Sequence, residues 1–222
     1  MTADDRTLHG FPHRWVPGEQ PLAPTLLLLH GTGGNEDDLV PLGRHLSPGS
    51  ALLSPRGKVR EHGLPRWFCR LAEGVFDEAD VVTRAGELAA FVRGTAGRYR
   101  FDPDNVVAVG FSNGANIAAA VLLLHPEVLR GAVLFSAMLP LRPATLPDLT
   151  HAAVYLSQGR VDPMAPPEQA EALATLLDEA GAAVTVDWHD GGHTLGAAQA
   201  DGARRWLLKL TAATAADAGG LP

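Results

Sequence analysis

The sequence has one cysteine, fewer basic than acidic residues, and no apolar run long enough to form a membrane helix. Because Cys69 is the only cysteine among 222 residues, an internal disulfide framework is excluded. The 18 Lys and Arg residues against 25 Asp and Glu residues give a formal net charge of -7, which disfavours nucleic acid and anionic membranes as partners. No apolar run approaches the ~20 residues of a membrane helix, and the first residues lack the apolar core of a signal peptide. We therefore expect a soluble cytoplasmic protein that acts on a small molecule.

The chain alternates apolar runs with helical segments. Thr25 to Leu29 and Val106 to Val109 are apolar runs that end in glycine-containing turns, which is typical of strands buried on both faces. Strands that alternate with helices indicate a mostly parallel sheet covered by helices on both faces. We predict a single α/β domain over residues 1–222 with frayed ends at 1–7 and 213–222. The other predicted strands are 51–54, 132–135, 153–156 and 184–188, and the predicted helices begin at Asn35 or cover 80–97, 112–124, 166–179 and 195–210.

The most informative segment is Gly-Phe-Ser-Asn-Gly at 110–114, which lies between a β-branched run and an Ala-rich helical segment. A Gly-x-Ser-x-Gly turn at a strand-to-helix junction holds the serine in a strained conformation and exposes its hydroxyl above the sheet. Flanking glycines allow the strand and helix backbones to approach closely. Ser112 is therefore the candidate nucleophile, and the alternative is a simple turn serine.

A nucleophilic serine needs a base and an acid that orients the base, and later loops supply both. Asp162 follows the strand predicted at 153–156, and His193 follows the strand predicted at 184–188. Because parallel strands end at the same edge of a sheet, these loops meet in one crevice. We predict His193 as the general base and Asp162 as its carboxylate. Asp187 and Asp190 are the competing acids, but a residue so near His193 in sequence rarely reaches the far imidazole nitrogen.

The tetrahedral oxyanion of acyl transfer is usually held by backbone N–H groups. Asn113, directly after the candidate nucleophile, would supply one donor. The glycine turn after the first buried strand would supply the other, most plausibly from Thr32, because Gly31 and Gly33 allow a close approach to substrate. We predict an oxyanion hole built from the N–H groups of Thr32 and Asn113.

Together these motifs resemble the phospholipase/carboxylesterase family of α/β-hydrolases. The resemblance rests on His-Gly-Thr-Gly-Gly-Asn at 30–35, the serine turn at 110–114, Gly-Arg-Val-Asp-Pro at 159–163 and Gly-His at 192–193. It extends over about residues 26–210. The resemblance implies a small α/β-hydrolase fold and serine-dependent hydrolysis of carboxylic esters or thioesters without a cofactor.

Two features favour the bacterial carboxylesterase branch of this family over the acyl-protein thioesterases. Asn113 stands where the thioesterase branch usually has Gln, and Arg-Trp-Phe occurs at 66–68. A thioesterase or lysophospholipase that acts on longer acyl groups remains the alternative, and a catalytically silent binding module on the same fold is the alternative from another class. Because soluble enzymes of this kind are often homodimers, a homodimer is the base-rate expectation.

The predicted crevice is open. Fewer than about 20 residues separate the strands 132–135 and 153–156, which is too few for a large helical lid. An open site suits short to medium acyl chains. The apolar residues predicted to line it, each of which could instead pack in the core, are Trp67, Phe68, Met138, Leu139 and Met164.

The long segment between residues 55 and 73 concentrates positive charge in an otherwise acidic chain. Arg66 is the predicted contact for substrates that carry a carboxylate. The alternative is a solvated loop with scattered ion pairs. The other basic residues of the segment are Arg56, Lys58, Arg60 and Arg70.

Three other sequence features could compete with the hydrolase prediction. His189 and His193 have the spacing of a metalloprotease helix, but two adjacent glycines between them oppose a helix, so we expect no metal site. Gly-Thr-Gly-Gly at 31–34 could suggest a dinucleotide fingerprint, but its third glycine is replaced by Glu36. His30, at the end of a buried strand, is predicted to have a structural role.

Overall fold

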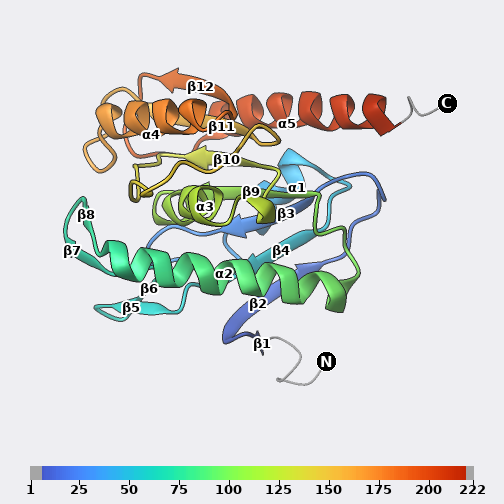
Figure 1. The fold of residues 1–222 in the computed structure, drawn as a ribbon, viewed down its shortest axis with the longest axis horizontal. Helices are drawn as coiled ribbons and strands as arrows, with labels where there is room; N and C mark the ends of the chain where they lie inside the picture. The colour runs from blue at the N-terminus through green and yellow to red at the C-terminus, as the bar shows by residue number, and fades with distance from the viewer. Residues whose placement is uncertain (1–6, 219–222) are drawn as a thin grey trace.

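The computed structural model describes the backbone of residues 7–218, and its centre is an eight-stranded mixed sheet. The strands stack in the order β1-β2-β4-β3-β9-β10-β11-β12, from the bottom to the top of Figure 1. Neighbours from β4 to β12 are parallel, whereas β1 and β2 form an antiparallel edge. The strand bounds are β1 Thr7–Leu8, β2 Phe11–Val16, β3 Thr25–Leu29, β4 Leu52–Pro55, β9 Val106–Phe111, β10 Gly131–Phe135, β11 Ala153–Gly159 and β12 Ala183–His189.

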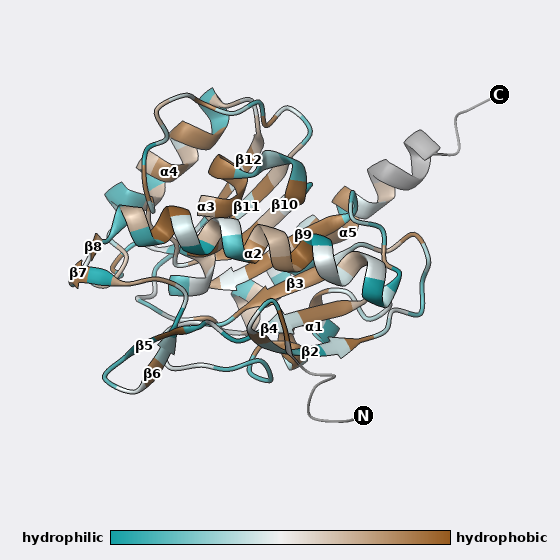
Figure 2. Cartoon of the chain, turned by 60° about the horizontal axis from the view of Figure 1, so that its bottom comes forward, coloured by the Kyte–Doolittle hydropathy of each residue, from teal (hydrophilic) through white to brown (hydrophobic). Residues whose placement is uncertain are grey.

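Helices cover both faces of this sheet and divide its core into two layers. The side chains of β3 alternate between the layers, with Leu26 and Leu28 on one face and Leu27 and Leu29 on the other, as the period of a strand requires. α1 and α5 pack on the first face, and α2, α3 and α4 pack on the second. In Figure 2 the central strands are largely brown, whereas teal appears in the loops and in patches along the helices. The helix bounds are α1 Val40–Leu46, α2 Glu78–Tyr99, α3 Asn113–Leu124, η2 Pro126–Val128, α4 Pro167–Glu179 and α5 Ala197–Ala218.

The predicted α/β-hydrolase architecture is confirmed. β3 and the first part of β9 are fully buried, which is why their sequences show continuous apolar runs rather than alternation. The segment at 136–152 between β10 and β11 contains no helix, so no large helical lid is inserted there. Among the helices of residues 7–218, none combines the length and apolarity needed to cross a bilayer.

The long basic segment at 55–73 and the residues that follow it contain short strands. β5 (Val59–Glu61) pairs with β6 (Leu64–Arg66), and β7 (Arg70–Ala72) pairs with β8 (Val75–Phe76). Each of these strands has only two or three residues, which is too short for an alternation of apolar and polar residues to predict it. Both hairpins lie at the left of Figure 1, beyond the carboxyl ends of the parallel strands.

Two predicted boundaries also differ. The first helix begins at Val40 rather than Asn35, because the Asn35 side chain accepts the Asp37 N–H at 2.8 Å and forms a turn before the helix. At the termini predicted to fray, residue 7 belongs to β1 and α5 continues to Ala218. The rest of that prediction, at 1–6 and 219–222, lies outside the described residues.

Candidate active site

Ser112 occupies a strained turn between β9 and α3. Its φ of 54° and ψ of -120° are unusual for a residue with a side chain, and such strain costs about 1–3 kcal/mol. The Ser112 N–H donates to the Phe135 carbonyl oxygen at 2.9 Å, which ties the turn to β10. A Cβ atom at Gly114 would overlap the Leu29 carbonyl oxygen, and one at Gly110 would overlap the first turn of α3. The two glycines therefore permit the close packing that the strained turn requires.

The side chains of Ser112, His193 and Asp162 form a continuous chain of hydrogen bonds. His193 Nε2 lies 2.9 Å from Ser112 Oγ, and His193 Nδ1 lies 2.8 Å from Asp162 Oδ2. With the Nδ1–H donated to the carboxylate, Nε2 is free to accept the serine proton. The Phe111 ring packs against the imidazole, with a centroid distance of 5.2 Å. The three residues come from the loops after β9, β11 and β12, which end at one edge of the sheet (Figure 1).

Asp162 is held as an acceptor. Its side chain is fully buried, and Oδ1 accepts the backbone N–H groups of Met164 and Ala165, each at 2.9 Å. These bonds leave Oδ2 directed at His193. A Cβ atom at Gly159 would overlap the Gly191 carbonyl oxygen, so this glycine lets the loops of Asp162 and His193 pack together.

The competing carboxylates lie elsewhere. The side chain of Asp190 is fully exposed and lies 3.8 Å from Arg160. Asp187 Oδ2 accepts the Tyr155 hydroxyl at 2.5 Å, and burial together with this bond raises the pKa of Tyr155. Among the carboxylates of the described residues, only Asp162 bonds to His193.

Two residues at the cavity of Ser112 have backbone N–H groups that remain unbonded in the described structure. Thr32 and Asn113 both line it, and neither N–H group has an acceptor among the described residues. The structure gives His30 a supporting position, as predicted: Nδ1–H donates to the Gly31 carbonyl at 2.7 Å and Nε2 accepts the Gly57 N–H at 3.0 Å. Burial lowers the pKa of His30, which keeps its ring neutral.

The cavity has a volume of about 140 Å³. Met138, Met164 and Arg66 line it, as the sequence suggested. Arg70 of the basic segment also lines the cavity. The cavity residues that the sequence did not suggest are Glu73, Gly74, Phe76 and Asn116.

Trp67, Phe68 and Leu139 do not line the cavity, so their prediction as acyl-wall residues is corrected. Phe68 is fully buried and packs edge-on against Phe76. Leu139 packs against the core on the α2–α3 side of the sheet. Trp67 is 2% exposed, and it is held by hydrogen bonds from its backbone N–H to Asn113 and from its indole N–H to His30. The core alternative is therefore the right one for these three side chains.

Acidic neighbours neutralise the basic segment. Arg66 pairs with Glu61 at 3.1 Å, and Arg70 pairs with both Glu61 and Glu73. The bond to Arg70 lowers the pKa of Glu61, whereas burial lowers the pKa of Arg66. The ion-pair alternative therefore describes this segment better than a free cationic patch. The remaining pairs are Arg56 with Glu36 and Lys58 with Glu87, while Arg60 donates to the Gly63 carbonyl.

No group of three or more His, Cys, Asp or Glu side chains in the described residues is arranged to hold a metal ion. His189 Nδ1 instead accepts the Gly191 N–H at 3.2 Å within its own turn. Cys69 is exposed, and desolvation and the neighbouring Asp80 raise its thiol pKa, which opposes a role as nucleophile.

Comparison with known proteins identifies the family of the chain. Residues 13–199 match the model of the family described as Phospholipase/Carboxylesterase. The chain is 49% identical over 181 residues to "Putative hydrolase MhqD" of Bacillus subtilis (strain 168), covering 82% of this chain and 90% of that protein. Among solved structures, a Bacillus cereus carboxylesterase superposes with a TM-score of 0.88 at 44% identity, covering 90% of this chain and 94% of that one. A carboxylesterase from Mesorhizobium loti gives 0.84 at 33% identity, with 89% and 94% coverage.

Proposed function

The chain belongs to the phospholipase/carboxylesterase family, and we propose that it is a serine carboxylesterase that cleaves esters of short to medium acyl chains. The observation that carries the proposal is the hydrogen-bonded chain from Ser112 Oγ through His193 to the buried Asp162 carboxylate. A base bonded to both a nucleophile and an orienting acid is the arrangement that activates serine. The positive φ of Ser112 adds support, because backbone strain collects at functional sites.

In the acylation half of the reaction, Ser112 Oγ attacks the ester carbonyl carbon while His193 Nε2 accepts the hydroxyl proton. The Asp162 carboxylate stabilises the imidazolium that forms. The carbonyl oxygen becomes an oxyanion and accepts the Thr32 and Asn113 N–H groups, which have no other acceptor among the described residues. When the carbon–oxygen bond to the alcohol breaks, His193 returns the proton to the departing alcohol.

In the deacylation half, water takes the place of the alcohol. His193 Nε2 removes a proton from the water, whose oxygen attacks the acyl carbon of the Ser112 ester. Collapse of the second tetrahedral intermediate breaks the bond to Ser112 Oγ, and His193 gives the proton back to the serine. The acid leaves and the enzyme is restored, so the cycle needs only water as a second substrate.

The cavity supports a preference for shorter acyl chains. Its volume of about 140 Å³ is well below the ~300–1,000 Å³ typical of pockets for drug-sized ligands. Met138 and Phe76 form apolar parts of its wall. The half-exposed Met164 lies at the cavity. A long chain would have to leave the cavity and lie on the exposed surface.

The test is the initial rate of hydrolysis of p-nitrophenyl esters from acetate to palmitate by the wild type and Ser112→Ala. We expect the fastest turnover with short chains and a loss of at least ~10⁴-fold in Ser112→Ala. Circular dichroism of the variant should match the wild type. A long-chain optimum would favour a lysophospholipase or thioesterase, and turnover that persists in Ser112→Ala would refute the proposed nucleophile.

A further inference from the structure

Trp67 connects the two segments that carry the proposed oxyanion donors. Its backbone N–H donates to Asn113 Oδ1 at 2.8 Å, and its indole Nε1–H donates to the His30 carbonyl oxygen at 2.8 Å. Asn113 is the first residue of α3, and His30 follows the last residue of β3. One buried residue therefore holds two elements that are far apart in the sequence.

We propose that Trp67 is a positioning residue that fixes the separation between the Thr32 N–H and the Asn113 N–H. This inference rests on the proposed function, because it concerns the oxyanion hole of that reaction. The Asn113 side chain that accepts the Trp67 N–H belongs to the same residue as one donor. The His30 carbonyl that accepts the indole lies two residues before the other donor, Thr32.

Further contacts stabilise this connection. The Gly33 N–H donates to the Pro65 carbonyl oxygen at 2.8 Å, which ties the other side of the Thr32 turn to β6, the strand that directly precedes Trp67. The rings of Trp67 and His30 pack with a centroid distance of 5.0 Å. Trp67, His30 and Asn113 are each at most 3% exposed. Because water cannot compete at buried sites, these hydrogen bonds hold their geometry better than exposed ones would.

The proposed role predicts a specific kinetic signature. Oxyanion donors interact with charge that develops only in the transition state, so misplacing them lowers kcat and leaves KM almost unchanged. Complete removal of one donor typically costs about 10²–10³-fold in kcat. Trp67→Phe keeps both donors and loosens their placement. We expect a smaller loss, of about tenfold in kcat.

The experiment compares Trp67→Phe with Trp15→Phe as a matched control. Both variants replace indole by phenyl, but Trp15 stacks on Tyr99 at the opposite edge of the sheet, and its indole N–H has no acceptor among the described residues. Kinetics with p-nitrophenyl butyrate are combined with the affinity for an aliphatic trifluoromethyl ketone. Ser112 Oγ adds to this ketone, its proton passes to His193, and the resulting oxyanion occupies the hole.

We expect Trp67→Phe to lose about tenfold in kcat and a similar factor in ketone affinity, with KM within about twofold of the wild type. Trp15→Phe should match the wild type in all three quantities. A raised KM with unchanged kcat would place Trp67 in substrate binding and overturn the inference. So would equal behaviour of the two variants.

A second variant covers the case in which Trp67→Phe does not fold. Asn113→Ala keeps the backbone donor at 113 and removes the side-chain acceptor of the Trp67 N–H, so it should show the same selective loss of kcat. Unchanged kcat in folded Asn113→Ala would overturn the inference. If the wild type itself lacked turnover dependent on Ser112, the proposed function would fail first, whereas an active wild type with unaffected Trp67→Phe would leave that function standing.

Discussion

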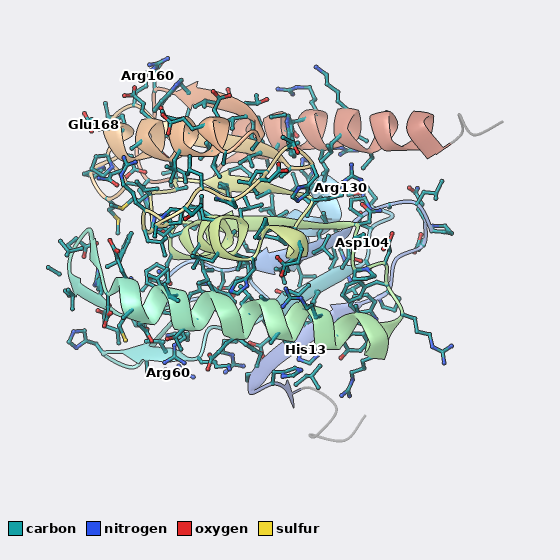
Figure 3. The ribbon with its side chains drawn as sticks, viewed as in Figure 1. His13, Arg60, Asp104, Arg130, Arg160 and Glu168 are labelled. Atoms are coloured by element: carbon teal, nitrogen blue, oxygen red, sulfur yellow. The ribbon has the colours of Figure 1, made fainter. Side chains whose placement is uncertain are left out.

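The two edges of the sheet both carry cavities, and the smaller cavity has the reactive geometry. A cavity of about 450 Å³ lies at the amino edge, where Thr25, Ala51 and Asn105 precede or begin strands. The cavity at the carboxyl edge measures about 140 Å³ and contains Ser112. In Figure 3, Asp104 before β9 and Glu168 at the start of α4 mark these two ends.

The difference between the edges lies in backbone strain and in how polar groups are paired. The amino-edge cavity has stacked aromatic rings, with Trp15 and Tyr99 4.6 Å apart, and the Asn105 side chain there already accepts from Arg130. At the carboxyl edge, Ser112 is strained and bonded to His193, and buried polar atoms such as Asn113 Nδ2 lack partners within the described structure. Pocket size is therefore a poor guide to chemistry here, whereas strain and convergent titratable groups are good ones.

Replacing one carboxylate at the carboxyl edge of the sheet and one at the amino edge should give the largest difference between the two edges, measured in kcat. Asp162→Asn should lose roughly 10⁴-fold in kcat. The amide oxygen would keep the bonds from the Met164 and Ala165 N–H groups, so the amide NH2 would face His193 Nδ1 and hold the imidazole in the wrong tautomer. Asp102→Asn, in the wall of the amino-edge cavity, should leave kcat unchanged. Steady-state kinetics with one p-nitrophenyl ester measure both. Asp190→Asn should be measured in the same series. If Asp190→Asn were inactive while Asp162→Asn kept its activity, Asp190 and not Asp162 would be the acid that orients His193.

Replacing one glycine near each edge of the sheet should give the next largest difference, measured in the free energy of unfolding. Gly114→Ala should cost at least ~3 kcal/mol in the free energy of unfolding, because the new Cβ would overlap backbone oxygens of β3 and the following residue. Gly97→Ala, near the carboxyl end of α2 with nothing within 4 Å of the new Cβ, should stabilise the protein by up to ~1 kcal/mol. Urea unfolding measures both. Equal effects of the two substitutions would mean that the turn at Ser112 relaxes more easily than its close packing indicates.

Local sequence patterns were sufficient to predict the parallel sheet and the loops that carry the candidate catalytic residues. The apolar runs of β3 and β9 through β12 and the glycine turns after them were sufficient to predict the parallel sheet and to place Ser112, Asp162 and His193 in loops at one edge. The β5–β6 and β7–β8 hairpins were not predicted, because strands of two or three residues show no alternation of apolar and polar residues. The β5–β6 hairpin is held partly by the ion pair of Arg66 with Glu61.

Trp67 shows why residues that hold the site in place without lining the cavity were harder to predict. Beside Arg66 in a long loop, an aromatic side chain looked suited to an acyl wall. Its place is set instead by hydrogen bonds to His30 and Asn113, which lie 37 and 46 residues away along the chain. Hydrogen bonds to backbone and amide groups leave no periodic trace in the sequence. Residues that hold a site in place can therefore be identified only from the folded structure, in which distant segments lie together.

The pH dependence of stability gives the smallest contrast and concerns His13 of β2. His13 is buried, its Nδ1–H donates to the Phe11 carbonyl at 3.0 Å, and its Nε2 bonds to the Tyr99 hydroxyl at 2.7 Å. Burial lowers the pKa of His13, as it does that of His30. In the unfolded chain both histidines bind protons as the pH falls through about 6.5, whereas the folded protein resists protonation. The unfolding free energy should therefore fall with decreasing pH in this range.

Each of these histidines contributes a slope of at most ~1.4 kcal/mol per pH unit below about pH 6.5, and the slope disappears below its folded pKa. His13→Gln should be less stable at pH 8 and should show a shallower decline between pH 7 and 5.5, because one site of proton uptake is gone. Urea unfolding at four pH values measures the slope for both proteins. An unchanged slope would mean that His13 titrates equally in the folded and unfolded states, so that its burial beside Tyr99 does not exclude the charged ring.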